Sequence, residues 1–193
     1  MLAQTEFQVF LDRLEDAMRS LPARYQLAFG AACCERHFSD YLRFSQEQNW
    51  GSPELLRRTM NIAWAISENG EPPPADWGQL LRDCINAIPH SEQFSMPVAD
   101  YAQNVGIMVA HLVEFMGQND PKKIVMTASA ARDLVDAKVQ ITERLKPTDP
   151  NLERKISEHP LMVSELNSQR SSLETLRRLG TEPGEFHRID ILD

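Results

Sequence analysis

The chain has 193 residues, of which 42% are hydrophobic and 25% are charged, and its formal net charge is −8. These values are typical of a globular protein with one hydrophobic core, and they disfavour a linker or a low-complexity sequence. Because 20 Lys and Arg residues stand against 28 Asp and Glu residues, we expect the surface to repel nucleic acids and anionic membranes.

The cysteines and the apolar segments predict a cytoplasmic protein. Of the three cysteines, Cys33 and Cys34 are adjacent, which is not the pattern of a disulfide framework. The N-terminal segment MLAQTEFQVFLDRLEDAMRS has no basic start and no continuous apolar run, so it does not resemble a secretory signal. The longest apolar stretch, VGIMVAHLVEFM, is too short to cross a bilayer.

Apolar residues recur at three- and four-residue spacing along most of the chain, which predicts helices. Proline, glycine and capping residues separate them: Pro22 suits a first turn, Ser39 suits an N-cap, Asp120-Pro121 starts a helix and Gly180 ends one. The predicted helices cover about residues 7–21, 22–38, 39–46, 53–66, 76–88, 97–117, 120–146 and 160–179.

The predicted fold is therefore all-α, a single-domain bundle of about eight helices. The helical domain is expected to span residues 1–180. Residues 181–193 form a C-terminal tail, for which an ordered extension and a frayed, flexible end are both open.

The stretch AACCERHF, residues 31–38, carries the densest group of chemically active side chains. On a helical projection, Glu35 and Arg36 point into the side that the rest of the helix buries, whereas His37 falls on a narrow polar stripe. Buried charges are costly unless they are paired. Two interpretations stay open: an acid/base or anion site at Glu35 and Arg36, or a structural ion pair with neighbouring helices. Candidate partners or co-lining residues are Arg57, Arg58, Asp83 and Glu114.

Metal and redox chemistry are not predicted at this stretch. Cys33 and His37 are spaced as metal ligands could be, but no CxxC or HxxxH pair supplies the other half of a site. Adjacent cysteines on a helix point about 100° apart and cannot bond to each other without breaking it. We interpret both cysteines as packing residues and His37 as a surface residue, and we expect no metal and no cofactor.

The segments LAFGAACCERHFSDYLRFSQE and LLRRTMNIAWA resemble the signature region of the YjaG-like family, bacterial proteins of unknown function. The triplet Cys34-Glu35-Arg36 is its most recognisable part, and the last helix, HPLMVSELNSQRSSLETLRRL, also fits. The chain departs from the family pattern at Ala32, where a second cysteine is expected, and this argues against a paired-cysteine function. The resemblance implies a compact helical fold in the bacterial cytosol, and it supplies no reaction, cofactor or catalytic residue.

No nucleophile elbow, P-loop, dinucleotide fingerprint or HExxH motif occurs in the sequence, and we name no catalytic residue. The leading hypothesis is a non-catalytic binding or regulatory protein that acts through a protein partner or a second copy of the chain. The alternative is an enzyme or small-ligand binder with a polar pocket formed by Glu35, Arg36 and Arg58.

Overall fold

The structure is a computed structural model that describes residues 6–94, 97–181 and 186–192. Within these residues it contains nine α-helices, one short 3₁₀-helix and no strand, so the predicted all-α class is confirmed. The helices are α1 (Glu6–Ser20), α2 (Ala23–Gln48), α3 (Pro53–Asn69), α4 (Trp77–Asn86), η1 (Ser91–Gln93), α5 (Val98–Gln118), α6 (Pro121–Thr142), α7 (Leu152–Ser157), α8 (Pro160–Thr181) and α9 (Ile189–Leu192).

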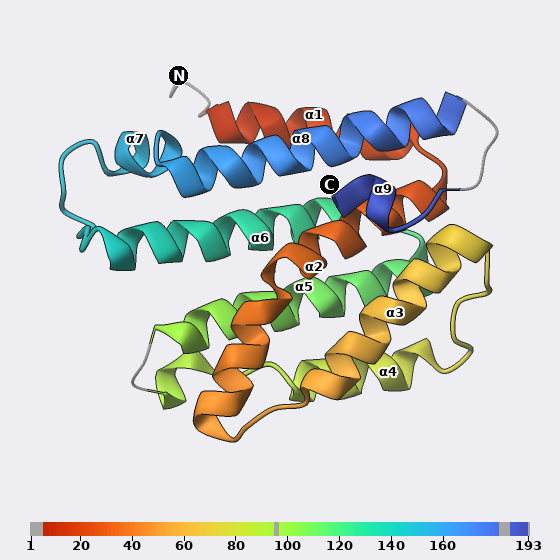
Figure 1. The fold of residues 1–193 in the computed structure, drawn as a ribbon, viewed down its shortest axis with the longest axis horizontal. Coiled ribbons are helices and arrows are strands. Elements are labelled where there is room, and N and C mark those ends of the chain that lie inside the picture. Colours follow the sequence, from red (N-terminus) through yellow and green to blue (C-terminus); the bar gives the residue numbers. More distant parts are fainter. Residues whose placement is uncertain (1–5, 95–96, 182–185, 193) are drawn as a thin grey trace.

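Three long helices form the centre of the bundle (Figure 1). α2 packs against both α5 and α6, which also pack against each other. α3 and α4 cover one side of this centre, and α1 and α8 cover the other. α8 contacts α2 and α6, and the short α9 lies against α2 and α8. The C-terminal part of the chain therefore closes over the middle of α2.

Pro22, Pro53 and the pair Asp120-Pro121 stand at the starts of α2, α3 and α6, as predicted. Gly180, predicted to end a helix, instead lies within α8, which continues to Thr181. Asp120 caps α6, because its carboxylate accepts a hydrogen bond from the backbone N–H of Lys122 at 3.1 Å. Ser52 precedes α3 but its side chain makes no capping bond. Its backbone N–H instead donates to the hydroxyl of Tyr41 at 3.1 Å. Asp76 likewise precedes α4 without a side-chain capping bond.

The predicted break near Ser39 is wrong, because α2 continues without interruption from Ala23 to Gln48. Ser39 is exposed in the middle of α2. The next residue, Asp40, forms an ion pair with Lys138 of α6 at 2.7 Å. A serine can occupy a solvent-facing helical position at small cost, so its preference for caps does not decide a helix boundary.

The core also depends on close helix approach at glycines. A Cβ atom on Gly117 would lie 2.2–2.5 Å from ring carbons of Trp77, so α4 and α5 meet there with no space for a side chain. Among the described residues, no helix is both long enough and apolar enough to cross a lipid bilayer.

Candidate functional site

The side chain of Arg36 crosses from α2 to α8 and forms a two-point ion pair with Glu165. Arg36 Nε lies 3.2 Å from Glu165 Oε2, and Arg36 Nη2 lies 3.1 Å from Glu165 Oε1. The side chain of Glu165 is only 4% exposed. This parallel arrangement is the strongest geometry available to a guanidinium and a carboxylate.

Two further residues complete the surroundings of the Glu165 carboxylate. His37 Nε2 lies 3.1 Å from Oε2, and Gln169 Nε2 donates to Oε1 at 2.7 Å. Gln169 also lies 3.2 Å from the backbone oxygen of Ala128, which connects the cluster to α6. The interpretation of His37 as a surface residue is wrong: the residue is 6% exposed, because Glu165 supplies the partner that lets it be buried.

The electrostatics of this cluster hold Glu165 in its ionised form. Burial by itself would raise the pKa of Glu165, but the hydrogen bond with His37 and the charge of Arg36 outweigh that effect and lower the pKa to about 2. The carboxylate is therefore negative at neutral pH and is a poor proton acceptor. It is suited to holding Arg36 in place, and it is not suited to general acid or base catalysis.

The neighbouring Glu35 points to a different set of partners. It forms an ion pair with Arg57 of α3 at 2.6 Å and a second one with Arg188, which lies just before α9. Both arginines contact Oε1, whereas Oε2 is buried without a hydrogen-bond partner among the described residues. Arg57 also lies over the ring of Phe38 at 4.0 Å. Glu35 thus joins α2, α3 and the C-terminal segment.

The C-terminal segment 186–192 packs against the body of the protein, and its described residues carry the contacts that hold it. Phe186 is buried and its ring lies 5.3 Å from the ring of Tyr25. The backbone N–H of Arg188 donates to Glu68, and its guanidinium lies 5.6 Å from the ring of Trp64. Of the rest of the predicted tail, Thr181 is the last residue of α8, and residues 182–185 and 193 lie outside the described residues.

Among the described residues, the three residues proposed from the sequence for one pocket point to different surroundings. Arg58 is exposed on α3, and the adjacent Arg57 is the residue that reaches Glu35. Glu35 is held by ion pairs on the α3 side of α2, whereas Arg36 faces α8. Of the three, Arg36 alone belongs to the groove described next.

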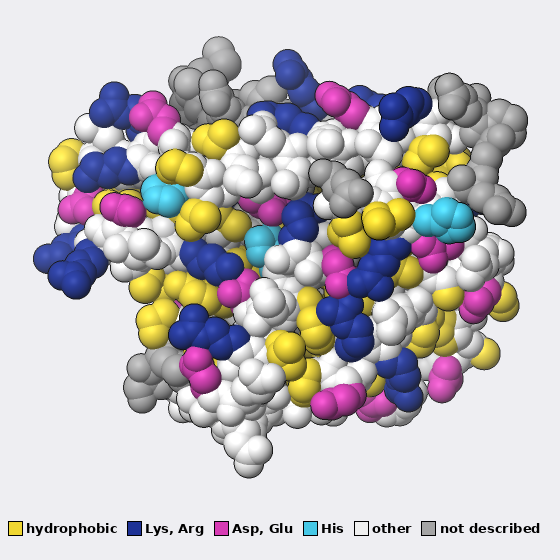
Figure 2. Space-filling view, viewed as in Figure 1, with side chains coloured by type: hydrophobic (Ala, Val, Ile, Leu, Met, Phe, Trp, Pro, Cys, Tyr) yellow, Lys and Arg dark blue, Asp and Glu magenta, His cyan; other side chains and the backbone are white. Residues whose placement is uncertain are grey.

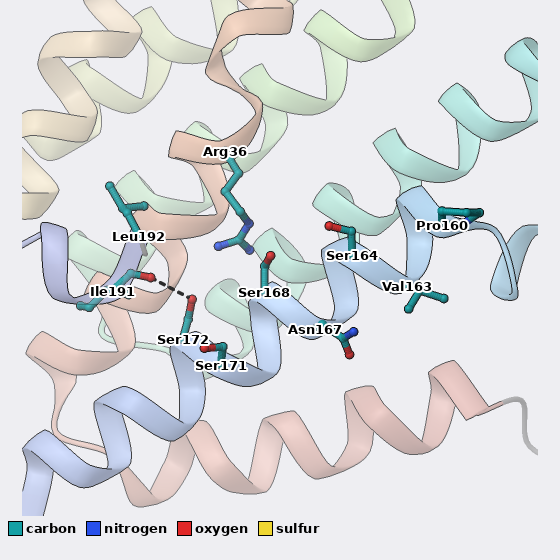
Figure 3. Close-up of a pocket in the computed structure, with 10 residues that line it drawn as sticks. All are labelled: Arg36, Pro160, Val163, Ser164, Asn167, Ser168, Ser171, Ser172, Ile191 and Leu192. Carbon is teal, nitrogen blue, oxygen red and sulfur yellow. Dashed lines mark hydrogen bonds between the residues drawn. The ribbon is translucent and has the colours of Figure 1, made fainter.

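A groove of about 550 Å³ runs between α8 and α9, with Arg36 on its inner side. Figure 3 shows the guanidinium of Arg36 and the hydroxyls of Ser164 and Ser168 pointing toward one another, while Val163 and Asn167 point away from Arg36. Arg36 is the charged residue of the described lining. The full lining is Arg36, Pro160, Val163, Ser164, Asn167, Ser168, Ser171, Ser172, Ile191 and Leu192.

The cysteines lie in the core. Cys33, Cys34 and Cys84 are free thiols and are buried. Burial raises the pKa of Cys33 to about 11 and raises that of Cys34 well above its ordinary value. Such thiols are poor nucleophiles. The described part of the chain contains no group of three or more His, Cys, Asp or Glu side chains that could hold a metal ion.

The α8 half of the site was not found from the sequence, although a signal is present. Glu165 and Gln169 occupy positions on the same helix face as the buried Met162, Leu173 and Leu176. Two polar residues on an apolar face indicate a buried polar network. The periodicity does not identify the distant partner, because Arg36 and Glu165 are separated by 129 positions.

These features define an all-helical protein with a buried ionic cluster beside an open groove, and comparisons with known proteins assign its family. The family model described as "Protein of unknown function (DUF416)" matches residues 13–187. The chain therefore belongs to the DUF416 family. A search of curated proteins found no match.

A solved structure has the same fold. The crystal structure of a DUF416 family protein from Shewanella baltica OS155 superposes with a TM-score of 0.78 and 17% sequence identity. The match covers 92% of this chain and 88% of the Shewanella chain. At this level of identity the likeness shows the fold alone.

Proposed function

We propose that the protein is a non-catalytic binding protein that accepts a segment of a partner protein in the groove between α8 and α9. The observation that carries the proposal is the groove itself, which has a volume of about 550 Å³ and is lined by Arg36 and by serine side chains of α8. Hydroxyls and a guanidinium can bind the polar backbone or side chains of a protein segment.

The shape and the rim of the groove support a protein segment over a small metabolite. Small-molecule sites bury most of the ligand's surface, whereas this groove is open, and a guanidinium and serine hydroxyls lie in it. Large apolar side chains are exposed next to it: Leu161, Val163 and Ile189 are 45%, 43% and 63% exposed. Figure 2 shows hydrophobic side chains gathered on the surface at α9. A polar centre with apolar residues at its edges suits an extended or helical segment of another protein.

The alternative is an enzyme or small-ligand binder with a pocket at Glu35, Arg36 and Arg58. It has less support, because Glu35 already forms ion pairs with Arg57 and Arg188. In addition, Arg58 does not line the groove. The low pKa of Glu165 also leaves the cluster without a carboxylic acid poised for proton transfer at neutral pH.

Within the DUF416 family, we propose the narrower YjaG-like affiliation and a bacterial, cytoplasmic setting. The triplet Cys34-Glu35-Arg36 supports the affiliation, and its two charged residues make the interhelical ion pairs described above. Three buried free thiols are compatible with a reducing compartment. The net charge of −8 supports protein partners rather than nucleic acids or anionic membranes.

Site-specific photo-crosslinking tests the proposal. A photoreactive phenylalanine is placed at Asn167, on the groove, and in a matched variant at Asn61, which is exposed on α3. We expect Asn167 to capture one defined protein, or a second copy of the chain, that Asn61 does not capture. The captured protein, once purified, must bind the unmodified chain and must lose binding to Ser164→Trp, which fills the groove. Equal capture from both positions, or unchanged binding to the Trp variant, would contradict the proposal.

A further inference from the structure

We propose that the groove recognises a single carboxylate, carried by an Asp or Glu side chain of the partner segment and bound by Arg36 together with Ser164 and Ser168. This inference rests on the proposed function, because it names the chemistry of the segment that the groove accepts. It follows from the hydrogen-bonding capacity of Arg36, from the placement of the hydroxyls and from the charge of the lining.

The guanidinium of Arg36 has donor capacity that Glu165 does not use. A guanidinium carries five N–H groups, arranged so that two edges can each bind a carboxylate. Glu165 takes Nε and Nη2, and Nη2 also contacts the sulfur of Cys33 at 3.4 Å. Nη1, with two N–H groups, has no hydrogen-bond partner among the described residues. A second carboxylate can therefore bind without displacing the first.

The hydroxyls of α8 lie where they can share such a carboxylate. Ser164 and Ser168 are four residues apart, so they occupy successive turns of one helix face. Figure 3 shows both hydroxyls directed toward the side on which Arg36 lies. Ser172, one turn further, is engaged with the backbone oxygen of Ile191 at 3.4 Å. One oxygen of a carboxylate can accept from Arg36 Nη1 while the other accepts from a serine hydroxyl.

The charge of the lining selects a carboxylate over a phosphate. Arg36 is the charged group among the described lining residues, on a chain whose net charge is −8. Its single positive charge is matched by the negative charge of Glu165. An added anion is therefore held by hydrogen bonds, and the single charge of a carboxylate is repelled less by the site than the two charges of a phosphate monoester. The apolar rim at Val163 and Leu192 favours apolar residues on either side of the acidic one.

Side-chain NMR of the ¹⁵N-labelled protein tests the inference with two matched probes. The first is the peptide acetyl-Leu-Asp-Leu-amide, and the second has Asn in place of Asp, which keeps the shape and removes the charge. We expect the Asp peptide to shift the Arg36 Nε–H resonance and the backbone amides of residues 164–171 in a saturable manner. We expect the Asn peptide to bind about tenfold more weakly, as befits the loss of a charge-assisted hydrogen bond.

Variants that leave the buried ion pair intact complete the test. Ser168→Asp places a competing carboxylate beside Arg36, and we expect it to weaken binding of the Asp peptide about tenfold. Asn61→Asp adds the same charge at an exposed position of α3, outside the groove lining, and should leave binding within about twofold, because separated surface charges are screened. Ser164→Ala together with Ser168→Ala should weaken binding severalfold.

The outcomes separate this inference from the proposed function. Equal affinity for the Asp and Asn peptides, shifts confined to residues outside the groove, or equal effects of the two Asp variants would overturn it. Inorganic phosphate that shifts Arg36 as strongly as the Asp peptide does, at the same concentration, would overturn the carboxylate preference. Crosslinking from Asn167 without an Asp preference would leave the proposed function standing and remove only the inference. An Asp preference without any crosslinked protein would remove the proposed function instead.

Discussion

The guanidinium of Arg36 and the carboxylate of Glu165 lie in parallel, with two nitrogen–oxygen contacts of 3.1 and 3.2 Å between α2 and α8. Because His37 also binds the carboxylate, two adjacent residues of α2 depend on a single residue of α8. Glu165 therefore has two effects: it holds α8 against α2, and it fixes the position of Arg36 in the groove.

Removal of the negative charge at this position should be costly. We expect Glu165→Gln to lower the free energy of unfolding by ~3 kcal/mol at pH 7, because it leaves the half-buried Arg36 without its counterion. Urea denaturation measures the change. Glu174→Gln, which makes the same replacement at an exposed position of α8, should change it by less than ~0.5 kcal/mol. Equal effects of the two variants would show that the ion pair contributes nothing.

The low pKa of Glu165 predicts a loss of stability in acid. The folded-state pKa of about 2 lies below the ordinary value of 4.5, so the stabilising contribution is fully present above pH 4.5 and is lost as the pH falls through 2. The difference corresponds to roughly 3 kcal/mol. Unfolding free energies measured between pH 7 and pH 2 should therefore fall more steeply for the wild type than for Glu165→Gln. Parallel curves would contradict the prediction.

The cluster around Glu35 should show non-additive energetics. Arg57→Gln or Arg188→Gln alone leaves Glu35 with one cation, and we expect each to cost about 1 kcal/mol, since both arginines are partly exposed. The double variant leaves a mostly buried carboxylate with no counterion, and we expect it to cost at least ~1 kcal/mol more than the sum. Chemical denaturation of the four proteins in this cycle measures the coupling. Simple additivity would show that the two arginines are not coupled to each other through Glu35.

The cysteines should be unreactive in the folded protein. All three are buried and burial raises the pKa of each thiol, so the reactive thiolate is scarce and inaccessible. Ellman's reagent should detect no fast-reacting thiol under native conditions and three thiols after denaturation. A thiol that reacts within seconds in the native protein would contradict this packing.

Even one added methyl group at the contact between α4 and α5 should destabilise the protein. Gly117→Ala brings a Cβ atom onto the ring of Trp77, and we expect a loss of about 1–3 kcal/mol in the free energy of unfolding. Gly78→Ala is the matched control, because the nearest atom to its Cβ is 3.9 Å away and belongs to the flexible side chain of Arg82. It should leave stability unchanged or raise it by up to ~1 kcal/mol. Thermal unfolding of the two variants distinguishes them.

The fold was largely predictable from the sequence, because its helices are separated by local signals. Pro53, the pair Asp120-Pro121 and Pro160 each stand at the start of a helix, as expected. These residues act within one or two turns, so a short window of sequence contains the information. Ser39 failed as a signal because capping residues are also tolerated on exposed helix faces.

The site was predictable only in its α2 half. The projection correctly indicated that Glu35 and Arg36 need partners, since their positions lie on the buried side of the helix. It could not identify Glu165, which belongs to another helix, and it therefore assigned His37 to the surface. The sequence also could not decide between Arg57 and Arg58. The two side chains point about 100° apart, and which of them faces Glu35 depends on how α2 and α3 pack.

The long separation between Arg36 and its carboxylate also affects synthesis of the protein. At about 5–20 residues per second, a ribosome needs on the order of 6–26 seconds to add the 129 residues that separate Arg36 from Glu165. During that interval the nascent α2 carries a cation whose counterion has not been made. Arg36 can therefore be buried only after α8 has been made. In a chain stalled before residue 165, α2 would be exposed to chaperones and proteases, although the finished protein encloses it.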